Sequence, residues 1–452
     1  MRIPKALNSP ARISVVSFAL LICIGTGLLT LPASTTKNTL GFIDALFTAT
    51  SASCVTGLIV VDTGKDLALF GQIVVLALIQ IGGIGIITFS TVFLLMAGRK
   101  IGLASRNSLQ DTFTHCGETT VVNLVLRIVK VTFIIETIGA MLLFLNFVGE
   151  NTVSHALYLA VFHAVSAFCN AGFSLFSDSF ESFQDNWLIN VALAFLIIAG
   201  GIGFLVLTEL GRKRPFTPSG WKKLSLHSKI ALSSCGILIF SGGVLFFAME
   251  YDNTLADLSF SNKLLAAFFQ SVTARTAGFN TLGIGHLANE TLFMLLVLMF
   301  IGGSSGSCAG GIKTGTFATL MVLGLSRLRG HDYPQIFRRT IGSVSVARAA
   351  SVVMVSLFVV VIAILLLQAT ELGGVDHVLT RGTFLELMFE TVSAFGTVGL
   401  STGVTGGLSD FGKITIILVM FVGRLGPLAI ALAIIKRKSA HYKFAEETIM
   451  IG

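Results

Sequence analysis

Long apolar runs alternate along the chain with shorter, more polar segments. Eight runs are long enough to cross the hydrocarbon core of a bilayer, which takes about 20 residues of helix; they lie near 13–31, 68–98, 121–148, 187–210, 229–249, 290–325, 350–369 and 412–435. A shorter segment lies inside each successive pair of runs, near 42–54, 155–169, 264–275 and 384–396. Short segments that contain Ser, Thr or charged residues are typical of re-entrant half-helices, which enter the membrane and turn back.

The composition agrees with this pattern. Apolar residues make up 54% of the 452 residues and charged residues only 12%, with a mean hydropathy of +0.87. A typical soluble domain carries about 25% charged residues, so a water-soluble protein of several domains is excluded. The six cysteines show neither metal-ligand spacing nor a disulfide pattern. The sequence therefore predicts an all-α polytopic membrane protein.

The charged residues indicate the orientation of the chain. Most Lys and Arg lie in the short basic head and in the loops 99–120, 212–229, 313–348 and 436–452, whereas most Asp and Glu lie in the loops that carry the short segments. By the positive-inside rule the first set faces the cytoplasm, which predicts that both termini are cytoplasmic. The first apolar run lacks a small-residue cleavage site and is interpreted as a retained helix. The net charge of +8 is thus a topology signal, and nucleic-acid binding is not expected.

Two landmarks recur in all four short segments. In each, a Phe is followed ten residues later by a Gly: Phe47 and Gly57, Phe162 and Gly172, Phe268 and Gly278, Phe389 and Gly399. A Gly cluster follows 24 to 28 residues after that Gly, beginning at Gly82, Gly200, Gly302 and Gly423. These landmarks predict four repeats, 1–110, 111–220, 221–340 and 341–452, the last with a cytoplasmic C-terminal tail. Each repeat reads as span, half-helix, glycine turn and span, giving eight transmembrane helices and four pore helices around a pseudo-fourfold axis.

Four glycine turns at one depth suit a monovalent cation. The carbonyl end of each half-helix carries about −0.5 charge, and glycine allows the positive φ that turns carbonyls inward. Four sets of carbonyls can replace the hydration shell of an ion. The candidate lining residues are each glycine and the two residues before it: Val55, Thr56, Gly57, Asn170, Ala171, Gly172, Thr276, Ala277, Gly278, Thr397, Val398 and Gly399.

The third and fourth repeats each depart from their siblings. In the third, a stretch rich in Gly and Ser at 302–314 interrupts the long apolar run, and such backbone must lie in protein or face water. In the fourth, Arg424 stands where the other repeats have Gly83, Gly201 and Gly303. A charged residue at membrane depth needs a partner or a cavity. Arg424 is therefore interpreted as a fixed positive charge close to the loop of the third repeat.

Five stretches of the sequence resemble one family. The segments IDALFTA at 43–49, VTGL at 55–58, NAGF at 170–173, RTAGFN at 275–280 and GRLGP at 423–427 are similar to the pore subunits of Ktr-type potassium transporters, in the Trk/Ktr/HKT superfamily. The resemblance covers essentially the whole chain. It implies potassium uptake through a filter with one glycine per loop, and four glycines imply a preference for K⁺.

The resemblance also implies a gate and an assembly. The stretch 302–314 would be an intramembrane gate loop below the filter, and the gate residues would be Gly302, Gly303, Ser304, Ser305, Gly306, Gly310, Gly311, Lys313 and Arg424. The expected partners are a second copy of the chain, membrane lipid and a cytosolic RCK-type regulatory ring that binds ATP or ADP. The basic inner loop around Arg338 and Arg339 is a candidate docking surface. The expected location is the bacterial plasma membrane.

Several alternatives stay open from the sequence. The chain is either a potassium pore, a sodium-coupled potassium symporter or a sodium-conducting relative of the same fold, with Na⁺ as a possible activator. A more distant alternative is a polytopic scaffold or a membrane enzyme. No Ser/His/Asp or paired-carboxylate set stands out, so neither enzymatic activity nor a bound cofactor is expected. His163 and Glu390, nine residues before their glycines, are interpreted as packing or as electrostatics at the pore mouth.

Overall fold

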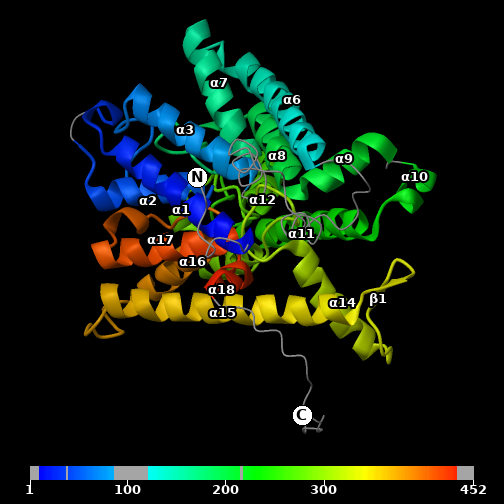
Figure 1. The fold of residues 1–452 in the computed structure, drawn as a ribbon. Coiled ribbons are helices and arrows are strands. Elements are labelled where there is room, and N and C mark those ends of the chain that lie inside the picture. The colour runs from blue at the N-terminus through cyan, green and yellow to red at the C-terminus, as the bar shows by residue number, and fades with distance from the viewer. Residues whose placement is uncertain (1–9, 37–38, 86–120, 214–216, 435–452) are drawn as a thin grey trace, which may run out of the picture.

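The computed structural model describes residues 10–36, 39–85, 121–213 and 217–434 (Figure 1). This part of the chain is almost entirely helical. The strands it contains are β1 (Gln335–Ile336) and β2 (Arg339–Thr340), which pair as a small antiparallel hairpin. The prediction of an all-α fold is confirmed at this level.

The helices form four successive groups of three. The groups are α1 (Pro10–Leu29), α2 (Phe42–Ser53) and α3 (Leu69–Ile84); α6 (Val121–Phe147), α7 (Val153–Phe168) and α8 (Trp187–Ile202); α11 (Leu226–Glu250), α12 (Phe260–Thr273) and α13 (Asn289–Phe300); and α15 (Ser343–Glu371), α16 (Thr383–Gly396) and α17 (Asp410–Leu425). Each group contains one predicted half-helix as its middle member. The four groups follow the order of the four predicted repeats.

The four groups are arranged around a centre in chain order. In Figure 1 the first lies at the left in blue, the second at the top in cyan, the third at the right in green and the fourth at the bottom in gold and orange. The last helix of each group packs on the middle helix of the next: α3 on α7, α8 on α12, α13 on α16 and α17 on α2. An ion pair of 2.7 Å between Lys413 of α17 and Asp44 of α2 joins the fourth group to the first.

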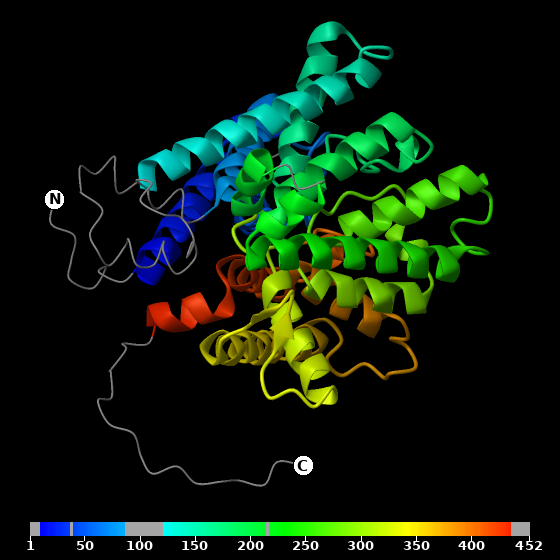
Figure 2. The same ribbon diagram turned by 90° about the vertical axis from the view of Figure 1, so that its right-hand side faces the viewer.

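The remaining elements extend from these groups. They are α9 (Phe204–Lys213), α10 (Pro218–Lys223), α14 (Thr314–Leu328), α18 (Pro427–Ile434) and the short 3₁₀ helices Pro32–Ser34, Glu181–Phe183, Ile284–His286 and Thr405–Gly407. Figure 2 shows α18, in red, near the beginning of α1. The Arg12 Nε donates to the carbonyl oxygen of Ala433 at 2.6 Å, which ties the two helices together.

Several predicted spans are not continuous helices. Among the described residues, four helices are long and apolar enough to cross a membrane by themselves, at Arg12–Leu29, Val125–Phe147, Leu226–Glu250 and Ser343–Glu371. The predicted runs 187–210, 290–325 and 412–435 are each interrupted. α8 and α9 are bent by 102° at Gly203, which has φ +102°, and α17 ends at Gly426, with φ +84°. α3 likewise ends at Gly85, and the rest of the run 68–98 lies outside the described residues. Hydropathy missed these breaks because glycine with positive φ ends a helix without any change in apolar character.

The glycine clusters also explain how the helices of one repeat pack. In three repeats the first glycine of the cluster lies directly against a carbonyl at the end of its own half-helix: Gly82 against Ser53, Gly200 against Phe168 and Gly423 against Phe395. A Cβ at any of these glycines would overlap the carbonyl oxygen. Both landmarks of the repeat therefore meet at one place, the C-terminal end of the half-helix.

Candidate ion pathway

The chain takes an unusual backbone conformation directly after each half-helix. Val55, Asn170, Thr276 and Thr397 all have positive φ, between 49° and 74°. The glycine two residues later has positive φ as well, from 70° at Gly172 to 94° at Gly399. The sequence predicted positive φ at the glycines but not at the residues two positions earlier.

Left-handed conformations are strained at Val55, Thr276 and Thr397, whereas asparagine, as at Asn170, adopts them more readily. Val and Thr are β-branched, and a β-branched residue with positive φ is an outlier. Each such residue costs about 1–3 kcal/mol and persists only where the surroundings enforce it, as at ligand clamps and active sites. The same conformation at the same place in four repeats, on a β-branched residue in three of them, indicates a shared structural requirement.

Hydrogen bonds from the half-helix hold each loop in this shape. Thr56 N–H donates to the Ser51 carbonyl at 2.8 Å, and Gly57 N–H donates to the Ser51 hydroxyl at 3.1 Å. Ser393 accepts the equivalent two bonds in the fourth repeat, at 2.9 and 3.1 Å. The serine six residues before the glycine therefore ties the loop amides back to the helix end.

The other two repeats use a hydroxyl differently. The Ser166 hydroxyl donates to the Phe173 carbonyl at 2.8 Å. The third repeat has Val272 in place of the serine, and the Thr273 hydroxyl donates instead to the Phe279 carbonyl at 2.5 Å. A hydroxyl at the end of the half-helix thus fixes the loop in all four repeats.

The four loops form a closed ring. A Cβ added at Gly57 would lie 2.5 Å from the carbonyl oxygen of Ala171, and one added at Gly172 would lie 2.8 Å from that of Ala277. Gly278 faces the Val398 carbonyl in the same way, and Gly399 faces the Thr56 carbonyl. Each glycine therefore contacts the next repeat in chain order, and the fourth contacts the first. No side chain larger than hydrogen fits at these four positions.

The carbonyls of the ring accept no hydrogen bond from the part of the chain that the structure describes. Across the described residues, no N–H or O–H group donates to any backbone carbonyl of the twelve candidate lining residues. Eight of these residues, those that are not glycine, have an exposed fraction of only 0–1%. Gly57 and Gly278 are buried as well, and Gly172 and Gly399 are half-buried. Backbone carbonyls inside a protein are normally paired, so the carbonyls of this ring need another partner. A desolvated cation is a suitable one.

An open pocket lies next to two of the ring glycines. It has a volume of about 440 Å³, and its lining includes Gly57, Gly399, Ser401, Asp62 and Asp66. The Asp62 carboxylate accepts the amides of Gly64 and Lys65 at 2.9 and 3.0 Å. These bonds orient the acidic loop beside the ring, where negative charge raises the local concentration of cations.

The glycine-rich stretch of the third repeat forms a non-helical loop between α13 and α14. Its two ends pair with each other, since Gly302 N–H donates to the Ile312 carbonyl at 2.9 Å. Its middle docks on the glycine cluster of the second repeat: Ser304 N–H donates to Gly201 O at 2.9 Å, and Cys308 N–H donates to Gly200 O at 3.1 Å. Backbone groups of the loop that interrupts the predicted run 290–325 therefore form hydrogen bonds within the loop and with the second repeat.

The loop lies against the ring loop of the fourth repeat. A Cβ added at Gly310 would overlap the Thr397 side chain, and one at Gly311 would lie 3.3 Å from the Gly396 Cα. Ser305 and Gly306 lie on the side of the loop that faces the second repeat. A Cβ added at Gly203 would lie 2.9 Å from the Ser305 carbonyl oxygen. The loop thus extends from the second repeat to the fourth, next to the ring.

Two basic side chains, the buried Arg424 and the half-buried Lys313, hold the carbonyls of this loop. The Arg424 guanidinium donates to the Cys308 carbonyl and, through its second terminal nitrogen, to the Gly82 carbonyl of the first repeat. The Lys313 ammonium donates to the Ala309 carbonyl at 2.5 Å and to the Gly310 carbonyl at 3.4 Å. Three consecutive carbonyls of the loop therefore face fixed positive charges, and Arg424 links three repeats.

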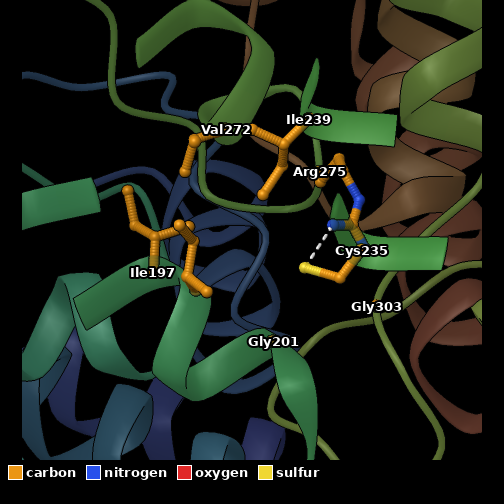
Figure 3. Close-up of a pocket in the computed structure, with 8 residues that line it drawn as sticks. Ile197, Gly201, Cys235, Ile239, Val272, Arg275 and Gly303 are labelled. Atoms are coloured by element: carbon orange, nitrogen blue, oxygen red, sulfur yellow. Dashed lines mark hydrogen bonds between the residues drawn. The ribbon is translucent and has the colours of Figure 1, made fainter. Parts of the chain in front are cut away.

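One further arginine lies beside the ring, and no role for it was predicted from the sequence. Arg275 directly precedes the strained Thr276, and its Nη1 donates to the Cys235 sulfur at 2.9 Å (Figure 3). It lines a cavity of about 10 Å³ between the second and third repeats, together with Gly201 and Gly303. That volume is about the size of one water molecule. Only the tertiary structure brings these residues together, because they come from distant segments.

The chain is similar to known cation transport proteins along almost its full length. The family model described as a cation transport protein, TrkH, matches residues 2–443. The chain is 41% identical over 446 residues to Ktr system potassium uptake protein B of Bacillus subtilis, which covers 98% of this chain and 97% of the relative. It is 37% identical over 460 residues to potassium/sodium uptake protein NtpJ of Enterococcus hirae, covering 100% of this chain and 99% of that protein. The crystal structure of the potassium transporter TrkH from Vibrio parahaemolyticus superposes with a TM-score of 0.76 at 19% identity, covering 96% of this chain and 87% of that one.

Proposed function

Because the chain belongs to the TrkH family of cation transport proteins, we propose that it takes up K⁺ through the ring of four glycine loops. The observation that carries this proposal is the ring of backbone carbonyls at the twelve lining residues, which no hydrogen-bond donor among the described residues reaches. Such carbonyls can replace the water around a monovalent ion. The C-terminal ends of α2, α7, α12 and α16 add negative potential at the same place.

The proposed arrangement in the membrane follows the four repeats. The first helix of each group crosses the membrane, and the third helix begins a second crossing that continues beyond the break at its end, making eight crossings. The middle helix enters from the outside and stops at the ring. Both termini are then cytoplasmic, as the distribution of basic residues indicates. The open pocket that contains Asp62 and Asp66 becomes the outer vestibule, and the loop 302–314 lies on the cytoplasmic side of the ring.

The loop 302–314 is proposed to be the gate. It lies beside Thr397 of the filter, and Arg424 and Lys313 hold three of its carbonyls. A loop in this position obstructs the path, and two fixed positive charges oppose a passing cation in a poorly screened cavity. Opening therefore requires the loop to move away from the ring.

Replacing Arg424 with alanine should raise K⁺ flux about fivefold and leave the K⁺/Na⁺ flux ratio unchanged. The substitution removes one of the two cations that hold the loop, while Lys313 still binds its neighbouring carbonyls. Flux into proteoliposomes measures both quantities. Arg348→Ala, which removes an exposed arginine of α15, is the control and should change neither. A changed ratio without any gain in flux would mean that Arg424 shapes the filter and not the gate.

The proposed function is tested by growth and by flux. The chain should restore growth at limiting K⁺ to a strain that lacks its own potassium uptake. In proteoliposomes, K⁺ should enter down its own gradient in the absence of Na⁺. If K⁺ entry requires a Na⁺ gradient, the protein is a symporter; that second candidate is favoured by the similarity to a potassium/sodium uptake protein. Failure of K⁺ to move under either condition would refute the proposal.

The assembly proposed for this protein is a homodimer that binds a cytosolic regulatory ring. By resemblance, that ring is of the RCK type and binds ATP or ADP. The β1–β2 hairpin exposes the two basic residues of its turn region, Arg338 and Arg339, and is the proposed contact. Analytical ultracentrifugation of the purified chain with and without such a ring measures the stoichiometry.

A further inference from the structure

Two buried polar side chains occupy equivalent positions in opposite repeats. His163 of α7 lies nine residues before the filter glycine of the second repeat, and Glu390 of α16 lies nine residues before that of the fourth. Both have an exposed fraction of 0%. The ring order places these two repeats across the pathway from each other. The first and third repeats have Thr48 and Phe269 at this position.

The hydrogen bonds of His163 define its protonation state. Leu175 N–H donates to Nε2 at 3.1 Å, and Nδ1 lies 2.8 Å from the Leu159 carbonyl oxygen. A backbone amide can only donate and a carbonyl can only accept, so Nδ1 carries the proton and Nε2 is the acceptor of a neutral imidazole. Phe176 stacks on the ring, with centroids 4.9 Å apart. The imidazole thus holds one specific amide of the chain beyond the filter.

Glu390 holds the corresponding segment of the fourth repeat. Thr402 N–H donates to its Oε1 at 3.2 Å, and the Thr405 hydroxyl donates to its Oε2 at 2.8 Å. The Ser401 hydroxyl also donates to Oε1. Ser401 and Thr405 line the outer vestibule, so the carboxylate fixes that part of the vestibule wall from within the protein.

The two contacts are geometrically equivalent although their chemistry differs. Leu175 and Thr402 each lie three residues beyond the filter glycine of their repeat. In both repeats the side chain nine residues before the glycine accepts a hydrogen bond from the backbone amide three residues after it. An imidazole nitrogen and a carboxylate oxygen therefore make the same bond to the same amide.

The other two repeats lack this contact. The Thr48 hydroxyl donates to the Asp44 carbonyl of its own helix at 2.8 Å, and Phe269 has no polar side-chain atom. The contact is thus a feature of one diagonal of the ring and not a general requirement of the repeat. Its restriction to opposite repeats suggests a role in fixing the width of the pathway.

We propose that His163 and Glu390 are positioning residues for the outer end of the ion filter. Each fixes the chain just beyond a filter glycine, so that the Gly172 and Gly399 carbonyls keep the separation that suits K⁺. A dehydrated ion is distinguished by the number and geometry of its carbonyl ligands, so a loosened outer end accommodates Na⁺ more readily. This inference rests on the proposed function of the ring as a potassium filter.

The test compares K⁺/Na⁺ flux ratios of variants in proteoliposomes, with the amount of folded protein measured by size-exclusion chromatography. His163→Phe and Glu390→Leu replace the acceptor with an apolar side chain of similar size. Each should lower the K⁺/Na⁺ flux ratio about fivefold. His163→Gln and Glu390→Gln retain an acceptor oxygen and should stay within about twofold of the unmodified protein. Thr48→Val removes a hydroxyl that bonds only within its helix and should leave the ratio unchanged.

The outcomes separate this inference from the filter proposal. Unchanged ratios in His163→Phe and Glu390→Leu, together with a lowered ratio in Gly278→Ser, would overturn the inference and leave the filter standing. If Gly278→Ser also has no effect, the filter proposal itself fails. Loss of selectivity that the glutamine variants do not restore would also overturn the inference, because packing and not the hydrogen bond would then be responsible. If Glu390→Leu does not fold, His163→Phe decides, since its ring retains the contact with Phe176.

Discussion

Replacing Gly278 with serine should lower the K⁺/Na⁺ flux ratio about tenfold. Gly278 has φ +79°, and an added Cβ would lie 3.1 Å from the Cα atoms of both Gly172 and Gly399, as well as against the Val398 carbonyl. Strain of this kind costs about 1–3 kcal/mol, and about 1.4 kcal/mol corresponds to a factor of ten. Relief requires the carbonyls of neighbouring loops to move apart, which alters the coordination that favours K⁺.

A glycine elsewhere in the same repeat supplies the control. Gly236 of α11 is exposed and has no atom within 4 Å of an added Cβ, so Gly236→Ser should leave both fluxes unchanged. Flux of each ion is measured separately in proteoliposomes at equal protein content. Unchanged transport of both ions by Gly278→Ser would refute the assignment of the filter.

Deleting residues 304–310 should raise K⁺ flux by more than about tenfold, with little change in the K⁺/Na⁺ flux ratio. The deletion removes the obstruction beside Thr397 and every loop carbonyl that Arg424 and Lys313 hold. It joins Gly303 to Gly311, which the structure permits because the loop ends already pair: Gly302 N–H donates to Ile312 O at 2.9 Å, and Thr314 N–H donates to Gly303 O at 3.0 Å.

The deletion and Arg424→Ala differ in a way that tests the gate independently. Only the deletion removes the bonds from the loop to Gly200 and Gly201 of the second repeat. We therefore expect the gain in flux to be larger for the deletion than for the substitution. Equal or reduced flux from folded deletion protein would contradict a gating role for the loop.

Much of the architecture could be predicted from the sequence because it depends on local patterns. Membership of the Trk/Ktr/HKT superfamily is confirmed by the match over residues 2–443. The half-helices were recognisable because their segments are short and each is followed by a glycine. In the structure these segments are α2, α7, α12 and α16, and each of the glycines has positive φ. Ser51, Ser166 and Ser393 recur in the sequence at a fixed spacing from that glycine, and the structure shows the hydrogen bonds that use them.

Other features depend on contacts between distant segments. No propensity favours positive φ at Val55 or Thr397, since the surrounding ring imposes that conformation on β-branched residues. The breaks at Gly203 and Gly426 are invisible to hydropathy, because the chain stays apolar on both sides. The bond from the Leu175 amide to His163 requires the loop to fold back on its helix. The spacing of His163 and Leu175 in the sequence does not indicate whether the loop folds back in this way.

The order of contacts around the ring has a consequence for biosynthesis. Gly399 closes the ring against the Thr56 carbonyl, so the first loop acquires its last neighbour only when the ribosome has translated the fourth repeat. A nascent chain that has inserted three repeats holds loops whose spacing is not yet fixed on two sides. The closed ring of four loops, and with it the proposed filter, is therefore complete only when translation is almost finished.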